Sequence, residues 1–192
     1  LDYLLDKLET NEQINKILEL NKYGWNFIHY LALNKNCNKE IIVILNKYHY
    51  NLNIETKYEK YTILMIYCMV ENRECFEYLL RNNKTDNIYK TDIYGNSILH
   101  YIGYSGMNYD FSLLNFNQNK ENNFGLTSYE CANVNLIYNI RKQQYNKANQ
   151  CFKTMNILKE KLEKLKRVPY NYESMSNMLE NMDNYYPNNI HI

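Results

Sequence analysis

Apolar residues recur along this chain at the spacing of helix faces rather than in the alternation of strands. Ile28, Leu31 and Ala32 would share one face of a helix, and the run Ile41–Leu45 would lie in a second helix shortly after it. Residues three and four apart lie on one side of a helix, because a helix turns once every 3.6 residues. Only five glycines and two prolines interrupt the chain. The pattern therefore predicts an all-α protein.

Both ends of the chain carry helical patterns of their own. Leu1–Leu8 and Ile14–Leu20 are predicted as two short helices, which would form an N-terminal cap or a degraded repeat over residues 1–20. Near the other end, an apolar seam follows 3-4-3-4-3 spacing. It consists of Ala148, Cys151, Met155, Leu158, Leu162 and Leu165. We assign a long C-terminal helix to residues 133–168 and a polar tail to 169–192. The seam would pack back on the preceding helices or pair with a helix of another molecule.

A polar turn motif precedes the helical pattern in the middle of the chain. Residues 92–100 read D-x-x-G-x-S-x-L-H, and Gly106 follows. A fainter copy at 21–32 has Gly24 and His29 in the equivalent places. The Ser, Thr or Asn of the motif recurs at 26, 62, 97 and 127, so the successive gaps are 36, 35 and 30 residues. The motif resembles the turn and first helix of an ankyrin repeat, whose period is about 33 residues.

The resemblance implies about four degenerate ankyrin repeats over residues 21–132. The second repeat has Lys60 in place of the turn glycine, and the fourth has Glu130 in place of the histidine. The second helix of the third repeat, near 110–114, is short. Helix pairs of this kind bury their apolar faces by stacking on their neighbours. The expected fold is a short ankyrin-type helical repeat solenoid with a long C-terminal helix.

The resemblance also implies a surface for protein recognition. In this family, variable positions in the turn and at the end of the inner helix form a concave contact face. Here they are Tyr23, Trp25, Tyr58, Tyr61, Tyr94, Asn96, Tyr104 and Phe124. Tyr and Trp offer large contact areas with few rotamers to freeze, and they dominate interface hot spots. The alternative is codon bias, since the chain has 21 tyrosines, although Trp25 is least open to that objection.

Catalytic motifs are missing from the sequence. It contains no GxxxxGK[ST], GxGxxG, HExxH or GxSxG pattern. His29 and His100 occupy equivalent positions, where the resemblance implies hydrogen bonds within the turn rather than catalysis. Five scattered cysteines form no C-x-x-C pair and no zinc spacing, which favours reduced, buried thiols in an intracellular, cytoplasmic protein. We therefore predict a protein that is not an enzyme, with no catalytic residue, no cofactor and no metal site.

The charge pattern narrows the class of partner. A net charge of +1 supplies no general attraction to nucleic acid. Glu160 and Glu163 interrupt the basic run from Lys159 to Arg167, so this run is interpreted as a solvated helix face. No apolar run approaches the ~20 residues that cross a bilayer. The expected partner is another protein, with no small-molecule substrate, no nucleic acid and no membrane insertion. The alternatives are a permanently assembled structural subunit of a large complex and the substrate-recruiting region of a larger enzyme.

Overall fold

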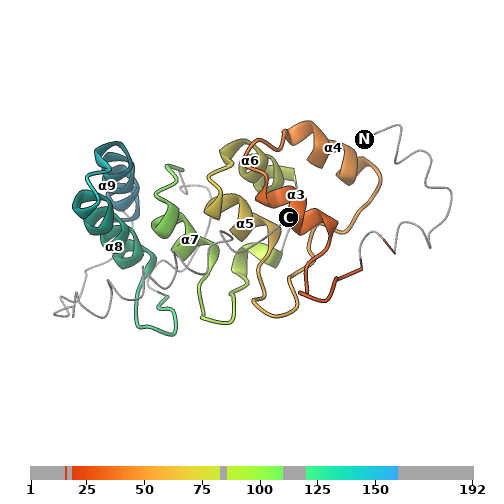
Figure 1. The fold of residues 1–192 in the computed structure, drawn as a ribbon, viewed down its shortest axis with the longest axis horizontal. Helices are drawn as coiled ribbons and strands as arrows, with labels where there is room; N and C mark the ends of the chain where they lie inside the picture. The colour runs from red at the N-terminus through yellow and green to blue at the C-terminus, as the bar shows by residue number, and fades with distance from the viewer. Residues whose placement is uncertain (1–15, 17–18, 83–85, 110–119, 160–192) are drawn as a thin grey trace. The chain divides into compact units, whose positions relative to one another are not determined.

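The computed structural model describes residues 16, 19–82, 86–109 and 120–159 (Figure 1). Within these ranges the chain forms seven α-helices and one short 3-10 helix, and it has no strand. Two isolated β-bridges join Glu55 to Thr62 and Thr91 to Ser97. The prediction of an all-α protein is confirmed. Most of the predicted N-terminal helices, the short helix near 110–114 and the polar tail lie outside the described residues.

The chain divides into two compact units. The first contains residues 1–101 together with 121–125, and the second contains 102–120 together with 126–192. Helix α7 (Ile98–Ser105) begins in the first unit and ends in the second.

The helices of the first unit form two layers. Inner helices α3 (Phe27–Leu33) and α5 (Ile63–Met69) pack against each other, as do outer helices α4 (Lys39–Lys47) and α6 (Arg73–Asn82). Helix α5 also packs against α6, and the 3-10 helix η1 (Asp86–Tyr89) follows them. The core is built from side chains at helical spacing, all at most 2% exposed: Ile28, Ala32, Ile42, Leu45, Leu64, Ile66, Phe76 and Leu79.

Inner helix α5 reverses into outer helix α6 without a glycine. Glu71 takes a left-handed backbone conformation, with φ of 57°. Its N–H donates to the carbonyl of Cys68, and the next N–H, of Asn72, donates to that of Tyr67. This is the Schellman arrangement, which satisfies the last carbonyls of a helix. Helix α4 ends in the same way, with His49 at φ of 58°.

The second unit is built around helices α8 (Ser128–Arg141) and α9 (Tyr145–Lys159), which pack against each other. Helix α9 also contacts the segment that follows α7, where Thr154 Oγ1 donates to the carbonyl of Gly106 at 2.7 Å. Several of the buried side chains of this unit are small: Cys131, Ala132, Val134, Ala148, Cys151 and Thr154.

The single long helix predicted over 133–168 is wrong in its first part. Helix α8 ends at Arg141 and α9 begins at Tyr145. Between them Gln143 takes a φ of 57°, and the N–H of Gln144 donates to the carbonyl of Asn139 at 2.8 Å. No glycine or proline marks this break. The seam residues Ala148, Cys151 and Leu158 are buried, while residues 160–168 lie outside the described part of the chain.

Candidate functional site

The four turns that precede the inner helices are built on one plan. Each begins with a polar residue whose side-chain oxygen accepts a backbone N–H from within the turn. Asn21 Oδ1 accepts the N–H groups two and four residues later, at 2.9 and 3.1 Å. Asp92 Oδ1 does the same at 2.9 and 2.7 Å, and Asn122 Oδ1 accepts one such bond at 3.0 Å. Thr56 Oγ1 accepts the N–H five residues later, because its turn is one residue longer.

Backbone hydrogen bonds link each turn to the next. The N–H of Lys57 donates to the carbonyl of Gly24 at 2.8 Å. In the same way the N–H of Ile93 donates to the carbonyl of Glu59 at 3.2 Å, and that of Asn123 to the carbonyl of Tyr94 at 2.9 Å. Gly24 has a φ of +77°, and a Cβ placed on it would lie 2.6 Å from Lys57 Cβ. Lys60, predicted to replace the turn glycine, does carry a positive φ of 63°. The segments 21–25, 56–61, 92–96 and 122–125 therefore form one connected row, which we call the turn row (Figure 1).

An aromatic side chain occupies the same place in every turn of this row. Tyr23, Tyr58, Tyr94 and Phe124 each lie two residues after the polar residue that anchors the turn. Tyr23 is 60% exposed, Tyr58 53% and Phe124 51%, while Tyr94 is half-buried. The rings of Tyr94 and Phe124 stack with their centroids 6.0 Å apart. We call these four residues the aromatic tips.

Two further predicted contact residues, Trp25 and Tyr61, are half-buried and pack against each other. Their rings meet edge to face with centroids 6.3 Å apart, and Tyr61 meets Tyr101 in the same way at 6.1 Å. Trp25 also contacts the ring of His29, at 5.7 Å. Burial raises the pKa of Tyr61 well above its usual range. These rings support the inner ends of the turns and leave only part of their surface exposed.

The remaining two predicted contact residues lie inside the protein. Asn96 is 3% exposed, and its side chain bonds to Asp92 Oδ2 (3.0 Å) and to Asn122 Nδ2 (2.7 Å). Tyr104 is 5% exposed, and its carbonyl accepts a hydrogen bond from Asn135 Nδ2. The prediction that these two side chains face a partner is wrong, since neither is accessible on the surface.

Asp92 lies at the centre of a buried polar network that the motif alone did not reveal. Its side chain is almost inaccessible, and Oδ2 accepts bonds from the Tyr101 hydroxyl at 2.5 Å and from Asn96 Nδ2 at 3.0 Å. Through Asn96 the network reaches Asn122, the anchor of the next turn. The third and fourth turns are thus held together by side chains as well as backbone.

Both motif histidines cap the helices in which they lie. His29 Nδ1 accepts the N–H of Asn26 at 3.1 Å, and Asn26 Oδ1 accepts the N–H of His29 at 3.2 Å. Nε2 of His29 lies 3.2 Å from the carbonyl of Ile54, so this nitrogen carries the proton of the neutral ring. His100 accepts the N–H of Ser97 in the same way, at 3.1 Å. The geometry agrees with the structural role that the resemblance implies for these histidines.

Replacing His29 by Gln should flatten the loss of stability at acid pH. Burial lowers the pKa of His29 below its ordinary value, outweighing the ring's bond to Ile54 and the carboxylate of Glu59, both of which raise it. The unfolded chain therefore takes up the proton first. The stability contributed by the neutral ring is complete above about pH 6.5 and is lost as pH falls toward the folded pKa.

Glutamine at the same position can keep the capping box without titrating. Urea denaturation at a series of pH values from about 7 to 5 should show a steeper fall for the wild type than for His29→Gln. The slope is compared rather than the absolute stability, because Gln does not reproduce the ring's bond to Ile54. Parallel curves would show that His29 titrates alike in the folded and unfolded chains.

The described residues contain neither a cluster of metal ligands nor a helix that could span a membrane. No three His, Cys, Asp or Glu side chains among them lie close enough to hold a metal ion. No disulfide joins the five cysteines, all of which are buried. Burial raises the pKa of four of these thiols, those of Cys37, Cys68, Cys75 and Cys131. None of the helices described is both long enough and apolar enough to cross a bilayer.

No family model matches the chain, and no curated protein matches it. The residues of the turn row are therefore the basis on which a function can be argued.

Proposed function

We propose that this chain is a protein-interaction module and that the turn row is its contact surface. The observation that carries the proposal is the recurrence of an aromatic residue at one structural position in four successive turns. Three of these four rings are more than half exposed. Large rings of this kind are the side chains that contribute most to binding energy at protein interfaces.

The turn row is preorganised by hydrogen bonds within the chain. Each turn has a side-chain anchor, and each is tied to the next by a backbone hydrogen bond. Ordering mobile loops on binding costs free energy, so preorganised turns improve affinity. The aromatic tips thus combine a large contact area with little loss of conformational freedom.

Codon bias accounts poorly for this arrangement. A bias toward tyrosine would scatter rings over all environments, and some of the 21 tyrosines, such as Tyr67 and Tyr101, are indeed buried. It would not select the second position after each anchor. It would also not explain Phe124, which occupies that position in the fourth turn. Exposed rings add little to folding, whereas an aligned group of them is typical of a binding site.

We further infer that the successive turn-and-helix segments of the chain are degenerate ankyrin-type repeats. Three features support this inference: the phase of the turns, the capping of the inner helices, and the pairing of α3 with α5 and of α4 with α6. The partner would be a folded surface or an extended segment of another protein. A permanently assembled subunit would use the same surface, with a slower rate of dissociation.

Removing an aromatic tip should weaken the binding of a protein partner. A photo-crosslinking amino acid at position 58 identifies the partner in a native lysate, and titration with the purified partner follows. We expect Tyr58→Ala and Phe124→Ala each to lower affinity about tenfold, close to 1.4 kcal/mol, because each removes a large ring from the interface. Both residues are exposed, so the free energy of unfolding should change by less than about 0.5 kcal/mol.

Tyr145→Ala is the matched control. Tyr145 is 63% exposed but lies in α9, outside the turn row. Its removal should leave affinity unchanged. A Tyr58→Ala/Phe124→Ala double variant that binds the partner as tightly as the wild type would exclude the aromatic tips as the contact surface.

A further inference from the structure

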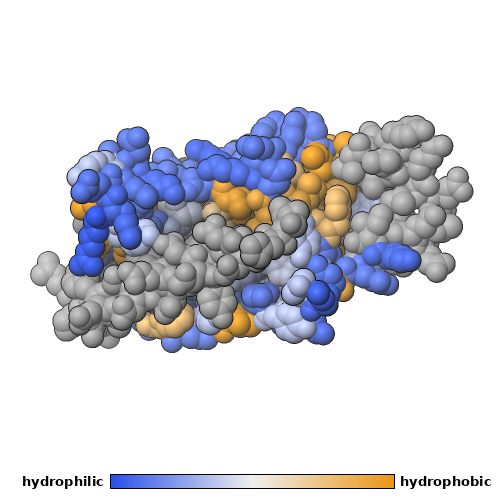
Figure 2. Space-filling model, viewed as in Figure 1, coloured by the Kyte–Doolittle hydropathy of each residue, from blue (hydrophilic) through white to orange (hydrophobic). Residues whose placement is uncertain are grey.

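The turn row is basic at one end and apolar at the other. In the first two turns the aromatic tip follows a lysine, giving Lys22–Tyr23 and Lys57–Tyr58, and Lys60 is also exposed. In the third turn the tip follows Ile93, which is 49% exposed, and in the fourth it follows Asn123. Figure 2, coloured by residue hydropathy, shows hydrophobic residues among hydrophilic ones at the third and fourth turns and mainly hydrophilic residues at the first two.

The basic end has a defined geometry. Lys22 Nζ lies 4.8 Å from the ring centroid of Tyr23, and Lys57 Nζ lies 5.4 Å from that of Tyr58. The Tyr58 hydroxyl donates to the carbonyl of Lys22 at 3.5 Å, so the two lysine–tyrosine pairs are neighbours. A lysine over an aromatic face is weakly held there by the ring's negative charge density. The ammonium groups are therefore positioned at the surface rather than free to scatter.

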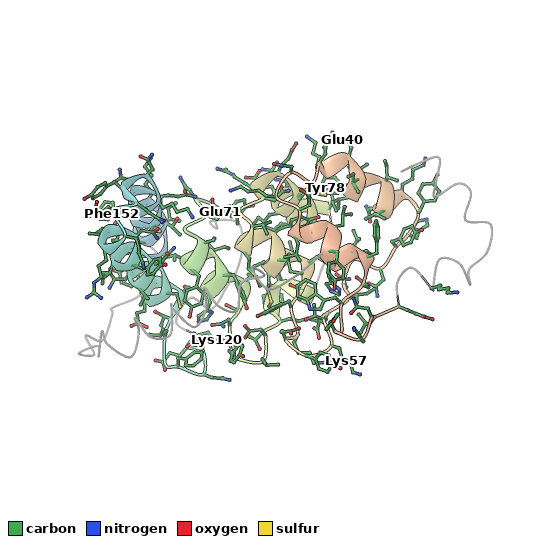
Figure 3. The ribbon with its side chains drawn as sticks, viewed as in Figure 1. Glu40, Lys57, Glu71, Tyr78, Lys120 and Phe152 are labelled. Atoms are coloured by element: carbon green, nitrogen blue, oxygen red, sulfur yellow. The ribbon has the colours of Figure 1, made fainter. Side chains whose placement is uncertain are left out.

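These lysines differ from others in the first unit because they form no ion pair with a described residue. By contrast, Lys39 Nζ forms an ion pair with Glu74 Oε1 at 2.8 Å, and Lys90 Nζ forms one with Glu55 Oε1 at 2.7 Å. Glu59, the acidic residue of the second turn, has one carboxylate oxygen buried. Figure 3 shows Lys57 projecting from the edge of the turns, at the opposite side of the unit from Glu40. The basic end thus presents positive charge that the described part of this chain does not neutralise.

We propose that the occupant of the turn row is an acidic, extended segment of another protein. Its carboxylates pair with Lys22, Lys57 and Lys60, and an apolar side chain next to them packs on Ile93 and Phe124. Positioned cations facing carboxylates set the register and speed association more than they add raw affinity. This inference rests on the proposed function and specifies the chemistry of the partner.

The same features disfavour nucleic acid as the occupant. A bound strand carries one phosphate per nucleotide, so it needs cations along its whole path. Within the turn row, the half that contains Ile93 and Phe124 has no cation, and directly before its last turn the exposed Lys120 and Glu121 carry opposite charges. No arginine occurs in the turn row, and the net charge of the chain is only +1. A segment that is acidic at one end and apolar at the other matches the row better.

Selection from a random peptide library displayed on phage, with the full chain as bait, tests the proposal. We expect the selected peptides to be enriched in Asp and Glu and to contain an apolar residue beside the acidic run. Synthesised with a fluorescent label, they should bind Lys22→Ala/Lys57→Ala about tenfold more weakly than wild type, as loss of two exposed charge contacts implies. Selection on Lys22→Glu/Lys57→Glu should enrich Lys and Arg instead.

Lys47→Ala is the matched control for the lysine variants. Lys47 Nζ also lies over an adjacent tyrosine ring, that of Tyr48 at 5.0 Å, but it belongs to the outer helix α4. Its replacement should leave peptide affinity unchanged. Thermal melting followed by circular dichroism confirms that each variant is folded.

The remaining outcomes separate this inference from the function on which it rests. Two results would contradict an acidic partner but keep the turn row as the contact surface. In the first, the selected peptides are neutral or basic. In the second, they bind the lysine variants as tightly as the wild type but no longer bind Tyr58→Ala. Failure to select any peptide sensitive to either kind of variant would count against both. Oligouridylate that binds more tightly than the peptides, and is lost in the lysine variant, would identify nucleic acid as the occupant.

Discussion

Gly103→Ala should destabilise the protein by about 3 kcal/mol, although alanine is the better helix former. Gly103 lies within α7, where a methyl group would normally add roughly 1 kcal/mol of stability. A Cβ built on it, however, would overlap the carbonyl oxygen of Ser128 and lie 3.1 Å from the backbone nitrogen of Ala132. Both obstacles are backbone atoms of α8, which cannot rotate away. The substitution therefore forces α8 to move and opens the packing of small side chains around Cys131.

Gly125→Ala is the comparison variant, because Gly125 has space for a methyl group but an unfavourable backbone conformation. A Cβ at Gly125 would meet nothing within 4 Å, but the residue has a φ of +72°, which L-residues avoid. This variant should lose only about 1 kcal/mol, the usual cost of a left-handed conformation. Urea denaturation followed by circular dichroism would rank the two variants. Greater stability of Gly103→Ala than of the wild type would show that α7 and α8 are farther apart than described.

The local elements of the first unit could be predicted because their signals are local. Helical spacing located α3 to α6, and the motif positions 26 and 62 coincide with the N-terminal caps of α3 and α5. Asn26 and Thr62 each accept a backbone N–H from the first turn of their helix. The resemblance implied hydrogen bonds of the motif histidines within the turn, and the structure shows that His29 makes them as the acceptor at the third position of a capping box. Glu130 fills that role in α8.

The break between α8 and α9 could not be predicted, because no residue with special backbone freedom marks it. Glutamine rarely takes a left-handed conformation, yet Gln143 does so here, as His49 and Glu71 do at the ends of α4 and α5. The bonds that Gln143 and Gln144 make to the preceding carbonyls compensate for the strain. The apolar seam begins only at Ala148, after the break, so it predicts a helix there without showing where that helix starts.

The environment of the predicted contact residues depends on partners distant in the sequence. The motif placed Asn96 beside Tyr94, but a hydrogen bond from Asn122, 26 residues later, draws it inside. Tyr104 is held through a bond from Asn135, 31 residues away. Trp25 is half-buried because Tyr61 belongs to the next turn. The aromatic tips, by contrast, follow the anchor of their own turn at a fixed spacing, and three of the four are well exposed.

Asp92→Ala should cost about 3 kcal/mol, because several buried donors lose their acceptor together. The carboxylate accepts two backbone N–H groups on one oxygen, and the Tyr101 hydroxyl and Asn96 Nδ2 on the other. Hydrogen bonds to a charged group contribute roughly 1.5–3 kcal/mol each, and donors left unsatisfied in the interior add a desolvation penalty. Relaxation of the third turn toward water keeps the total below a simple sum.

Asp92→Asn is the control, and its milder effect identifies which bonds matter. Asn21 and Asn122 already anchor their turns through an amide oxygen, so the two backbone bonds should survive. On the other side the new amide group replaces an acceptor, so the Tyr101 hydroxyl would have to turn and accept a bond, and Asn96 Nδ2 would lose its acceptor. We expect a loss of about 1 kcal/mol in the free energy of unfolding, and this loss should be non-additive with that of Tyr101→Phe in a double-mutant cycle.

Because this network joins the third turn to the fourth, Asp92→Ala should also lower the affinity for a partner that binds the apolar end of the turn row. Urea denaturation that places Asp92→Ala within about 0.5 kcal/mol of wild type would show that the carboxylate is not buried in this network.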